Sequence, residues 1–401
     1  MNIAGIVGEY NPFHKGHEYH INKTRELIGE NGAVVCVMSG DFVQRGEPAA
    51  MNKHARAEAA VRCGADLVIE LPLPWSIASA ERFAHAAVRL LDSLGVIGYL
   101  SFGSECGDVE ALYALASALR DPVMQESIKA ELSSGISYAA ARQKALEKLL
   151  GNAARFLETP NNILAVEYLK ALSELNSPMK PLTVQRVGAE HDSIAGYGIR
   201  SASEIRALML AGEDISELLP EKSVGVYLRE RQNGRCPVTA RSLEQAIMSR
   251  LRALPAEAFE LLPDAGEGLG NRLYSAAQNE PTLDAVLAAA KTKRYAMSRI
   301  RRMVMCAALG VTAEMQAAES LYARVLACNE CGRKVLKEIS EASEVKIITK
   351  PASARELEPD LRQVFEVSAR ARDLYVLGYG AAEERRGGTD WMTSPAIVYT
   401  K

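Results

Sequence analysis

Short apolar runs alternate with longer segments of helical period through the first third of the chain. The apolar runs are bounded by Gly, Ser, Asn or Pro and are expected to be buried strands: Ile3–Val7, Ala33–Met38, Asp66–Ile69 and Ile97–Phe102. The segments between them have the period of amphipathic helices: His17–Ile28, Lys53–Cys63 and Ala80–Leu94. This alternation, with continuously apolar strands, predicts an α/β fold with a Rossmann-like parallel sheet and helices on both faces.

The pattern of the remaining chain is mainly helical. Helices are predicted over residues 105–175 and Ser201–Leu210, with a strand between them at Pro181–Val187. Further along, helical segments are joined by Pro- and Gly-rich loops, and one helix is predicted over Leu321–Ile339. Two small strands and one mobile loop are expected near the C-terminus: Val345–Ile348, Ala396–Tyr399 and the loop Gly380–Asp390.

The length of the chain favours two domains. At 401 residues it is too long for one compact core. We place an α/β domain at residues 1–210 and a mainly helical domain with small C-terminal strands at residues 211–401. Apolar residues make up 48% and charged residues 24%, which excludes a disordered or fibrous chain.

The charge balance restricts the possible partners. A net charge of −3 excludes a protein coated in positive charge, so contact with nucleic acid must come from a local patch. Apolar runs such as Asp66–Pro74 are far shorter than the ~20 residues of a membrane span, and the N-terminus lacks the pattern of a secretion signal. We expect a soluble, cytoplasmic protein without a membrane anchor or a stable protein partner.

The segment after the first predicted strand carries the strongest chemical signal. It reads Gly8-Glu9-Tyr10-Asn11-Pro12-Phe13-His14-Lys15-Gly16-His17 and opens the first predicted helix. In an open parallel sheet, this turn faces the crevice where ligands bind. Gly16 lets the backbone approach a ligand, and the helix N-terminus offers free N–H groups to an anion. We expect His14 and His17 to donate hydrogen bonds to a phosphate chain. The alternative interpretation is a surface helix lined with histidines that bind no ligand.

Two patterns suggest a metal site, and neither is favoured. His14, His17 and His20 are regularly spaced, but helical positions six residues apart diverge by about a third of a turn, so three ligands cannot converge. Cys328 and Cys331 have zinc or redox spacing, but no second pair or nearby His completes a site. We predict no metal held by the protein alone.

A second loop follows the next predicted strand at the same edge of the sheet. Gln44 and Arg45 lie between Gly40 and Gly46 in this loop. The pair is suited to a small carboxylate or a phosphate, because Arg offers a bidentate fork. The alternative interpretation is an ordinary surface loop, and the position beside the crevice favours binding.

Three further segments are weaker candidates. Gly103 ends the fourth predicted strand, where a nucleotide could lie against bare backbone. Pro160-Asn161-Asn162 has the pattern of a turn and helix cap. Ser201 and Glu204 fit a capping box at an ordinary helix start, but the same N-terminus with Arg206 would also suit phosphates.

One segment of the second half is strongly basic. Residues 291–302 carry six basic residues and no acid: Lys291, Lys293, Arg294, Arg299, Arg301 and Arg302. On a helix, Arg294, Arg301 and Arg302 would share a side, and Tyr295 would be available to stack on a base. This patch is suited to an RNA backbone, and the alternative is a solvated helix face.

The motifs together resemble a known family. Pro12-Phe13-His14-Lys15-Gly16-His17 is similar to the His-x-Gly-His motif of the nucleotidyltransferase superfamily. Further segments resemble the bacterial tRNA(Met) cytidine acetate ligases, and the resemblance covers nearly the whole chain: Met38–Pro48, Asp66–Pro72, Phe102–Glu105 and Pro160–Leu164.

The resemblance implies a set of site residues. His14 and His17 would be catalytic, and Gln44 and Arg45 would form the acetate or phosphate pocket. The ATP site would comprise Val7, Gly8, Glu9, Tyr10, Asn11, Pro12, Phe13, His14, Lys15, Gly16, His17, Glu18, Tyr19, His20, Gly103, Asn161, Asn162, Arg186, Ser203 and Arg206. The choice between Asn161 and Asn162 stays open, as does the role of Lys15.

The resemblance also implies a reaction. ATP with Mg²⁺ would activate acetate as acetyl-adenylate, and the acetyl group would pass to the wobble cytidine of elongator tRNA(Met). The basic segment of the helical domain would contact the tRNA. Two alternatives use the same sequence: a small-metabolite adenylyltransferase without RNA, and a non-catalytic RNA-binding protein with a relic nucleotide fold. The long helical half disfavours the first, and intact His14, Gly16 and His17 disfavour the second.

Overall fold

A mixed, mostly parallel sheet forms the centre of the molecule. The computed structural model describes residues 1–136, 138–186, 199–319 and 321–399. The eight-stranded sheet has the order β10-β8-β5-β2-β1-β6-β7, with β9 also paired to β8. Its strands are β1 Ile3–Gly8, β2 Ala33–Ser39, β5 Leu67–Leu71, β6 Tyr99–Ser104, β7 Lys180–Gln185, β8 Tyr322–Cys328, β9 Lys346–Ile348 and β10 Ala396–Ile397. A small hairpin, β3 Phe42–Val43 and β4 Glu47–Pro48, pairs separately.

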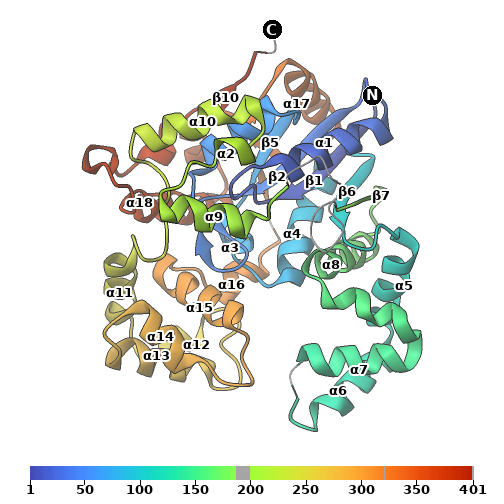
Figure 1. The fold of residues 1–401 in the computed structure, drawn as a ribbon, viewed down its shortest axis with the longest axis vertical. Coiled ribbons are helices and arrows are strands. Elements are labelled where there is room, and N and C mark those ends of the chain that lie inside the picture. Colours follow the sequence, from blue (N-terminus) through green and yellow to red (C-terminus); the bar gives the residue numbers. More distant parts are fainter. Residues whose placement is uncertain (137, 187–198, 320, 400–401) are drawn as a thin grey trace.

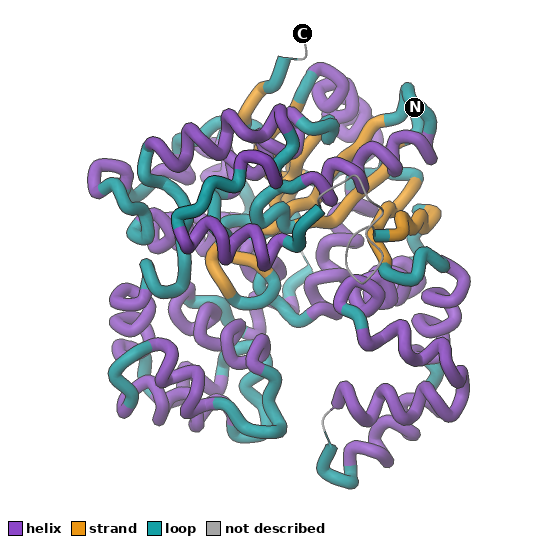
Figure 2. The backbone as a smooth tube through the Cα atoms, viewed as in Figure 1, coloured by secondary structure: helices purple, strands orange, loops and turns teal. Residues whose placement is uncertain are grey.

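The central strands are buried on both faces, which explains their continuous apolar runs. In β2 the side chains of Val35 and Val37 pack into one core, and those of Cys36 and Met38 pack into another. This follows from the alternation of side chains along a strand. Helices cover both faces, as Figures 1 and 2 show, and the predicted doubly covered sheet is confirmed.

Helices of the first half surround this sheet. α1 and α2 contribute to one core, and α4 and α8 contribute to the other. The bounds are α1 Lys15–Ile28, α2 Lys53–Arg62, α3 Leu73–Ser76, α4 Ala80–Ser93, α5 Val109–Arg120, α6 Pro122–Leu132, α7 Tyr138–Leu150, α8 Pro160–Glu174, α9 Ala202–Ala211 and α10 Glu221–Gln232. The helices predicted in the first third thus begin and end within two residues of their predicted bounds.

A separate apolar core holds most of the helices of the second half. It joins α11 to α15 with α18 and with Phe42 of the small hairpin. In Figure 1 helices α11 to α15 form the lower left lobe, across from α6 and α7, and α18 lies above them. The bounds are α11 Glu244–Ala253, α12 Ala256–Glu260, α13 Leu269–Asn279, α14 Leu283–Ala290, α15 Met297–Leu309, α16 Ala313–Ala317, α17 Glu330–Ala342 and α18 Pro359–Val376. Short 3₁₀ turns lie at Gly151–Glu158, Ser216–Leu218, Pro351–Glu356, Ala382–Glu384 and Thr389–Trp391.

The helix predicted over Leu321–Ile339 is wrong in its first half. Tyr322–Cys328 is the strand β8, which runs antiparallel to β5, so the sheet is mixed instead of wholly parallel. All seven residues of β8 are buried, and a short, mostly apolar run such as this one, interrupted only by Arg324, cannot be assigned to helix or strand by period alone. Because β8, β9 and β10 join the central sheet, the boundary predicted at residue 210 separates strands that pair with one another.

The other C-terminal predictions had different outcomes. The strands predicted at Val345–Ile348 and Ala396–Tyr399 are present as β9 and the shorter β10, whereas Val187, the expected end of β7, lies outside the described residues. The loop predicted at Gly380–Asp390 ends in the interior, with Asp390 1% exposed. Its many polar residues suggested solvent, but Asp390 is held by buried cations.

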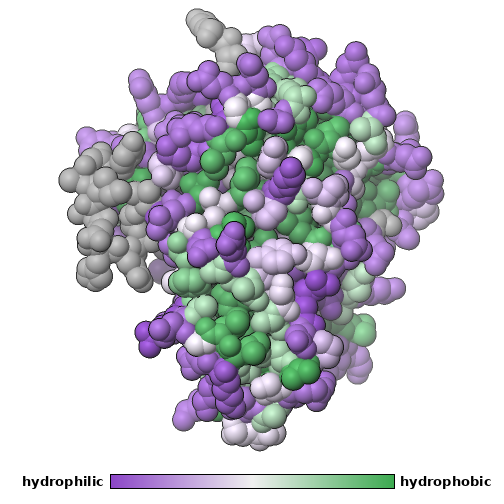
Figure 3. Space-filling model, turned by 90° about the vertical axis from the view of Figure 1, so that its right-hand side faces the viewer, coloured by the Kyte–Doolittle hydropathy of each residue, from purple (hydrophilic) through white to green (hydrophobic). Residues whose placement is uncertain are grey.

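The surface carries scattered apolar side chains. Figure 3 shows hydrophobic residues in the lower half of the face formed by α5 to α8. Val123 of α6 and Leu149 of α7 are exposed. Among the described residues, none of the helices is both long and apolar enough to cross a membrane.

Candidate active site

A pocket opens at the carboxyl ends of β6 and β7, beside the start of α1. It is lined by residues from β6, β7, α1 and the approach to α9: His14, Gly16, His17, Tyr19, His20, Gly103, Val184, Gln185, Arg186, Ile199, Arg200 and Ser201. The structure thus brings together segments that lie far apart in sequence. This is the edge of an open α/β sheet where ligands bind.

The first turn of α1 fixes two imidazole rings. His14 is the N-cap residue, and its Nδ1 accepts a hydrogen bond from the Gly16 N–H at 3.0 Å. His17 Nδ1 accepts from the His14 N–H at 3.3 Å, so the two side chains form a capping box. The rings stack with centroids 3.8 Å apart. Because both Nδ1 atoms accept, each neutral ring carries its proton on Nε2 and can donate a hydrogen bond from there.

The environment keeps these rings neutral. Burial, reinforced by the Arg186 and Arg206 cations, lowers the pKa of His14 to about 4. Burial also lowers the pKa of His17 well below its usual value, and His14 and Arg186 add to this effect. At neutral pH the pair therefore offers N–H donors without a charge of its own. Such fixed donors stabilise negative charge that develops on a bound phosphate.

The third histidine is tied to the sheet. His20 Nε2 lies 3.0 Å from the Ser101 hydroxyl, which also contacts the Thr24 hydroxyl at 2.6 Å. Burial lowers the pKa of His20 to about 4. The three rings do line one pocket, because His14 precedes the helix instead of lying on it. Among the described residues, however, no cluster of three or more His, Cys, Asp or Glu side chains is arranged to hold a metal ion.

The residues before His14 form the base of this site. Val7 and Gly8 end β1, and Tyr10 is buried with its hydroxyl donating to Cys36 Sγ at 3.1 Å. Asn11 Oδ1 accepts from the Ala50 N–H at 2.8 Å. The remaining members of the predicted set lie here as well: Pro12 and Phe13 are buried, and Lys15, Glu18 and Tyr19 are half-buried on α1. These contacts hold the turn that presents the histidines.

Gly103 and Arg186 meet on the opposite wall. A Cβ atom at Gly103 would lie 3.4 Å from Arg186 Cγ, so glycine leaves the arginine side chain free to lie across the strand. The Arg186 N–H donates to the Ser104 carbonyl at 2.9 Å, which continues the pairing of β7 with β6. The Arg186 side chain is exposed beside the histidines.

The two candidate asparagines differ in their surroundings. Asn162 is 1% exposed, and its Oδ1 accepts from the Glu105 N–H at 2.9 Å. Asn161 is half-buried, and its Nδ2 donates to Glu105 Oε1 at 2.6 Å. Asn162 therefore holds the loop after β6, and Asn161 is the one that a ligand could reach more directly.

The start of α9 brings a cation against the histidine loop. Ser201 and Glu204 form the predicted capping box, so the helix N-terminus is held in place. Arg206 donates to the Asn11 carbonyl at 2.8 Å and to the Ser203 hydroxyl at 3.4 Å. The guanidinium thus crosses from α9 to the turn that carries His14.

Gln44 and Arg45 lie in the hairpin loop beside Glu9. The Gln44 N–H donates to Glu9 Oε1 at 2.7 Å, and the Gln44 side-chain amide donates to the Ala78 carbonyl at 3.2 Å. Burial raises the pKa of Glu9, although Arg56, Arg45 and Arg206 oppose the shift. Arg45 is exposed. The predicted pair therefore divides: Gln44 positions Glu9, and Arg45 is available to a ligand.

Arg56 is a positioning residue that the sequence did not reveal. Its fully buried guanidinium donates to the carbonyls of Glu9, Ser39 and Gly40, and Nε donates to the Met51 carbonyl at 2.9 Å. It therefore joins the ends of β1 and β2 beneath the histidine turn. An arginine within a Lys53–Arg62 helix is typical of a surface face, so no sequence signal distinguished it.

The basic segment differs from its predicted form. α15 begins only at Met297, and Tyr295 is buried with its hydroxyl donating to the Glu267 carbonyl at 2.6 Å. Tyr295 is therefore not available to stack on a base, and Arg294 does not share a helix face with Arg301 and Arg302. Hydrogen bonds within the segment hold the turn before α15: the Lys291 ammonium donates to the Thr292 carbonyl at 2.6 Å, and the Arg294 N–H donates to the Thr292 hydroxyl at 3.2 Å.

The acidic partners of this segment neutralise half of it. Three arginines form ion pairs, at 2.8, 2.5 and 2.9 Å respectively: Arg299 with Glu267, Arg301 with Glu47 and Arg302 with Asp264. The Lys291 ammonium donates to the Tyr295 carbonyl at 2.6 Å. Lys293 and Arg294 are exposed, and among the described residues no side-chain partner is found for either. The basic surface is thus smaller than the sequence suggested.

Comparison with known proteins agrees with this geometry. A family model described as HIGH Nucleotidyl Transferase matches residues 1–390. The chain therefore belongs to the HIGH nucleotidyl transferase family.

Relatives that match over nearly their whole length carry a more specific name than the family model does. The chain is 37% identical to the tRNA(Met) cytidine acetate ligase of Acetivibrio thermocellus, over 99% of this chain and 100% of that protein. It is 39% identical to the protein of the same name from Caldanaerobacter subterraneus subsp. tengcongensis, over 94% of this chain and 96% of that protein. The crystal structure of Thermotoga maritima TmcAL bound with alpha-thio ATP matches with a TM-score of 0.92, 32% identity and complete coverage of both chains.

Proposed function

We propose that this protein is an ATP-dependent ligase that acetylates the wobble cytidine of elongator tRNA(Met). The observation that carries the proposal is the stacked, neutral His14–His17 pair at the N-terminus of α1, with Arg186 and Arg206 close by. Two Nε2–H donors and two cations around one pocket suit the phosphates of ATP. Relatives named tRNA(Met) cytidine acetate ligase, matched over nearly the whole chain, support the substrate class.

The first step would join acetate to the nucleotide. An acetate oxygen attacks the α-phosphorus of ATP, the bond to the bridging oxygen of pyrophosphate breaks, and acetyl-adenylate forms. Acetate is already ionised at neutral pH, so this step needs no base. His14 and His17 would stabilise the charge on the phosphate oxygens, and Arg206 would neutralise the leaving pyrophosphate.

The second step would transfer the acetyl group. The exocyclic amine of cytidine attacks the acyl carbon, AMP leaves with its negative charge, and the amine loses one proton. A cytosine amine is weakly basic, so holding it against the adenylate supplies most of the rate.

Arg45, exposed beside Glu9, would hold the acetate carboxylate before the first step, in which acetate is activated.

Mg²⁺ would accompany the nucleotide. Mg²⁺ is commonly held by substrate phosphates with one or two carboxylates, so a dedicated protein cage is not required. This fits a site without a metal-binding cluster in the described part of the chain. The central sheet and its helices would bind ATP, and the helices around α15 would contact tRNA through the exposed Lys293 and Arg294.

The test is mass spectrometry of elongator tRNA(Met) incubated with the protein, ATP, Mg²⁺ and isotopically heavy acetate. We expect a heavy acetyl group on the wobble cytidine, absent without ATP. A protein that binds ATP but labels no tRNA would instead favour an adenylyltransferase acting on a small metabolite.

A further inference from the structure

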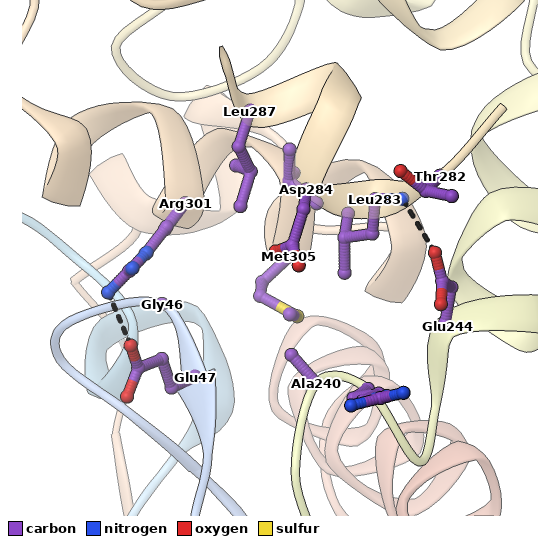
Figure 4. Close-up of a pocket in the computed structure, with 12 residues that line it drawn as sticks. Gly46, Glu47, Ala240, Glu244, Thr282, Leu283, Asp284, Leu287, Arg301 and Met305 are labelled. Atoms are coloured by element: carbon purple, nitrogen blue, oxygen red, sulfur yellow. Dashed lines mark hydrogen bonds and ion pairs between the residues drawn. The ribbon is translucent and has the colours of Figure 1, made fainter. Parts of the chain in front are cut away.

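A larger cavity lies outside the histidine pocket. It has a volume of about 410 Å³ and opens between the β3–β4 hairpin, the start of α11, α14 and α15. Leu283, Leu287, Val304 and Met305 form an apolar floor. Figure 4 shows Asp284 directed into the space above Met305. A cavity of this size accommodates one nucleotide-sized group.

The charged groups of this cavity fall into two sets. Arg301 pairs with Glu47 at 2.5 Å, and Glu244 Oε1 accepts from the Leu283 N–H at 2.8 Å, so these side chains form part of the wall. Asp284 and Arg241 also line the cavity, but both are exposed, and in the described parts of the chain neither side chain has an ion pair or hydrogen-bond partner. One anion and one cation are therefore available to a ligand.

The cavity is joined to the proposed catalytic site by the hairpin. Gln44 contacts Glu9 on one side of the hairpin, and Glu47 contacts Arg301 on the other. The hairpin lies directly against α15 at Gly46, whose φ is 73°, and a Cβ atom at this position would collide with the Arg301 backbone. Only glycine fits this close approach without displacing α15. The hairpin is therefore a common support of both sites.

We propose that this cavity binds an unstacked ribonucleotide of the tRNA substrate, next to the one that is modified. The nucleotide's phosphate would pair with Arg241, and a ribose hydroxyl or exocyclic amine would donate to Asp284. The base would lie on the floor of Leu287 and Met305. A site with one cation, one anion and an apolar surface matches these parts of a ribonucleotide, and sequence-specific RNA recognition commonly binds unstacked nucleotides.

This inference rests on the proposed function, and its test separates the two. Arg241→Ala and Asp284→Asn are compared with Arg250→Ala and Glu257→Gln, exposed residues of neighbouring helices that do not line the cavity. Affinity for tRNA is measured directly, and acetate-dependent exchange between ATP and pyrophosphate is measured without tRNA. The exchange reports only the adenylation step at the histidine pocket.

We expect each cavity variant to weaken tRNA binding roughly tenfold, as one lost charge-assisted contact would do, while exchange stays at the wild-type rate. Both control variants should match the wild type. Unchanged tRNA affinity in both cavity variants would overturn the inference. If wild-type protein performs exchange but acetylates no tRNA, the proposed function fails, and the tRNA affinities still decide the role of the cavity.

A second readout locates the effect. In hydrogen exchange, saturating tRNA should slow the amides of residues 240–247 and 283–290 in the wild-type protein and not in Arg241→Ala. Arg241 lies in a turn before α11, so its substitution is expected to leave the fold intact. Protection confined to other segments would contradict binding in this cavity.

Discussion

The histidine pocket and a buried ionic cluster differ in whether their polar side chains are fully paired within the protein. The cluster comprises Lys53, Glu70, Arg324 and Asp390, each no more than 2% exposed. The Lys53 ammonium lies 2.8 Å from Glu70 and 2.9 Å from Asp390, and Arg324 lies 2.6 Å from Asp390. Every charge there has an opposite charge within the protein. In the histidine pocket, the Nδ1 atoms are satisfied by the backbone and the opposite ring edges can donate.

Burial changes the charge of the titratable groups differently in the two regions. Burial by itself would raise the pKa of Asp390, but Arg324 and Lys53 outweigh it and hold that pKa well below its usual value. At His14 and His17 burial lowers the pKa, the neighbouring Arg186 acts in the same direction, and the charge is removed. The cluster is thus complete without a ligand and contributes to the fold, whereas the pocket keeps donors for a partner. Substitutions should therefore affect stability in one region and chemistry in the other.

The largest effect is expected in the cluster. Asp390→Ala leaves Lys53 and Arg324 buried without their shared carboxylate, and should lower the free energy of unfolding by about 3–5 kcal/mol. Urea unfolding followed by circular dichroism measures the change. Glu126→Gln, which breaks an exposed ion pair with Lys129, is the matched control and should cost less than about 0.5 kcal/mol. Equal losses in both variants would refute the distinction.

His17→Ala should show the reverse pattern. It removes one donor to the phosphates and should slow acetate-dependent exchange between ATP and pyrophosphate by about 10²–10³-fold. The lost bond to the His14 N–H should cost only about 1 kcal/mol of stability. Exchange and urea unfolding are measured on the same preparation. Near-normal exchange would remove His17 from the chemistry.

Mild acid should destabilise the protein through its buried histidines before the Asp390 carboxylate of the cluster is protonated. The pKa of His14 and of His20 is about 4, below the value near 6.5 of an unfolded chain. The unfolded state therefore binds more protons between these values, and stability falls as the pH decreases from about 6.5 to 4. Each histidine contributes a loss on the order of 3 kcal/mol at pH 4. Asp390, with its lowered pKa, contributes only at still lower pH.

Urea midpoints between pH 7 and pH 4 test this order. His14→Asn keeps a good N-cap side chain and removes the titrating ring, so its stability should decline less steeply than that of the wild type. His54, whose pKa burial also lowers to about 4, will retain part of the slope. Identical slopes in both proteins would show that His14 does not titrate in this range.

The smallest effect is expected where α9 meets the pocket. Ser201→Ala removes the capping oxygen that accepts from the Glu204 N–H at 3.3 Å, and should cost about 1 kcal/mol. Because Arg206 lies one turn further along, the KM for ATP should rise a few-fold with little change in kcat. Steady-state kinetics measure both, and Ser201→Asp, another good cap, should restore much of the stability.

Local patterns predicted most of the first half. The strands β1, β2 and β5 and the helices α1, α2 and α4 were predicted closely, because their apolar runs and caps are set by nearby residues. The β3–β4 hairpin and the short helix α3 were not predicted. The capping box at Ser201 was predicted for the same reason. β8 was missed because its apolar run fits a helix equally well, and only its pairing with β5 selects the strand.

The site was predicted in part. The motif from Gly8 to His17 located the histidine turn, since a strand followed by a helix N-terminus is visible in sequence. Arg56 was not found, because a single arginine in a helix does not reveal that its guanidinium lies against three carbonyl groups at the ends of two strands, β1 and β2. The basic segment predicts an exposed Tyr295 ring, but the fold buries it.

The sequence by itself determined the apolar strands, the helix caps and the order of chemical groups along the turn from Gly8 to His17. These features depend on residues a few positions apart, so local sterics and hydrogen bonding suffice to specify them. The tertiary structure decided which charges are neutralised inside and which remain for a ligand. Asp390 and Arg301 find partners hundreds of positions away, and only the folded chain brings such groups within hydrogen-bonding distance.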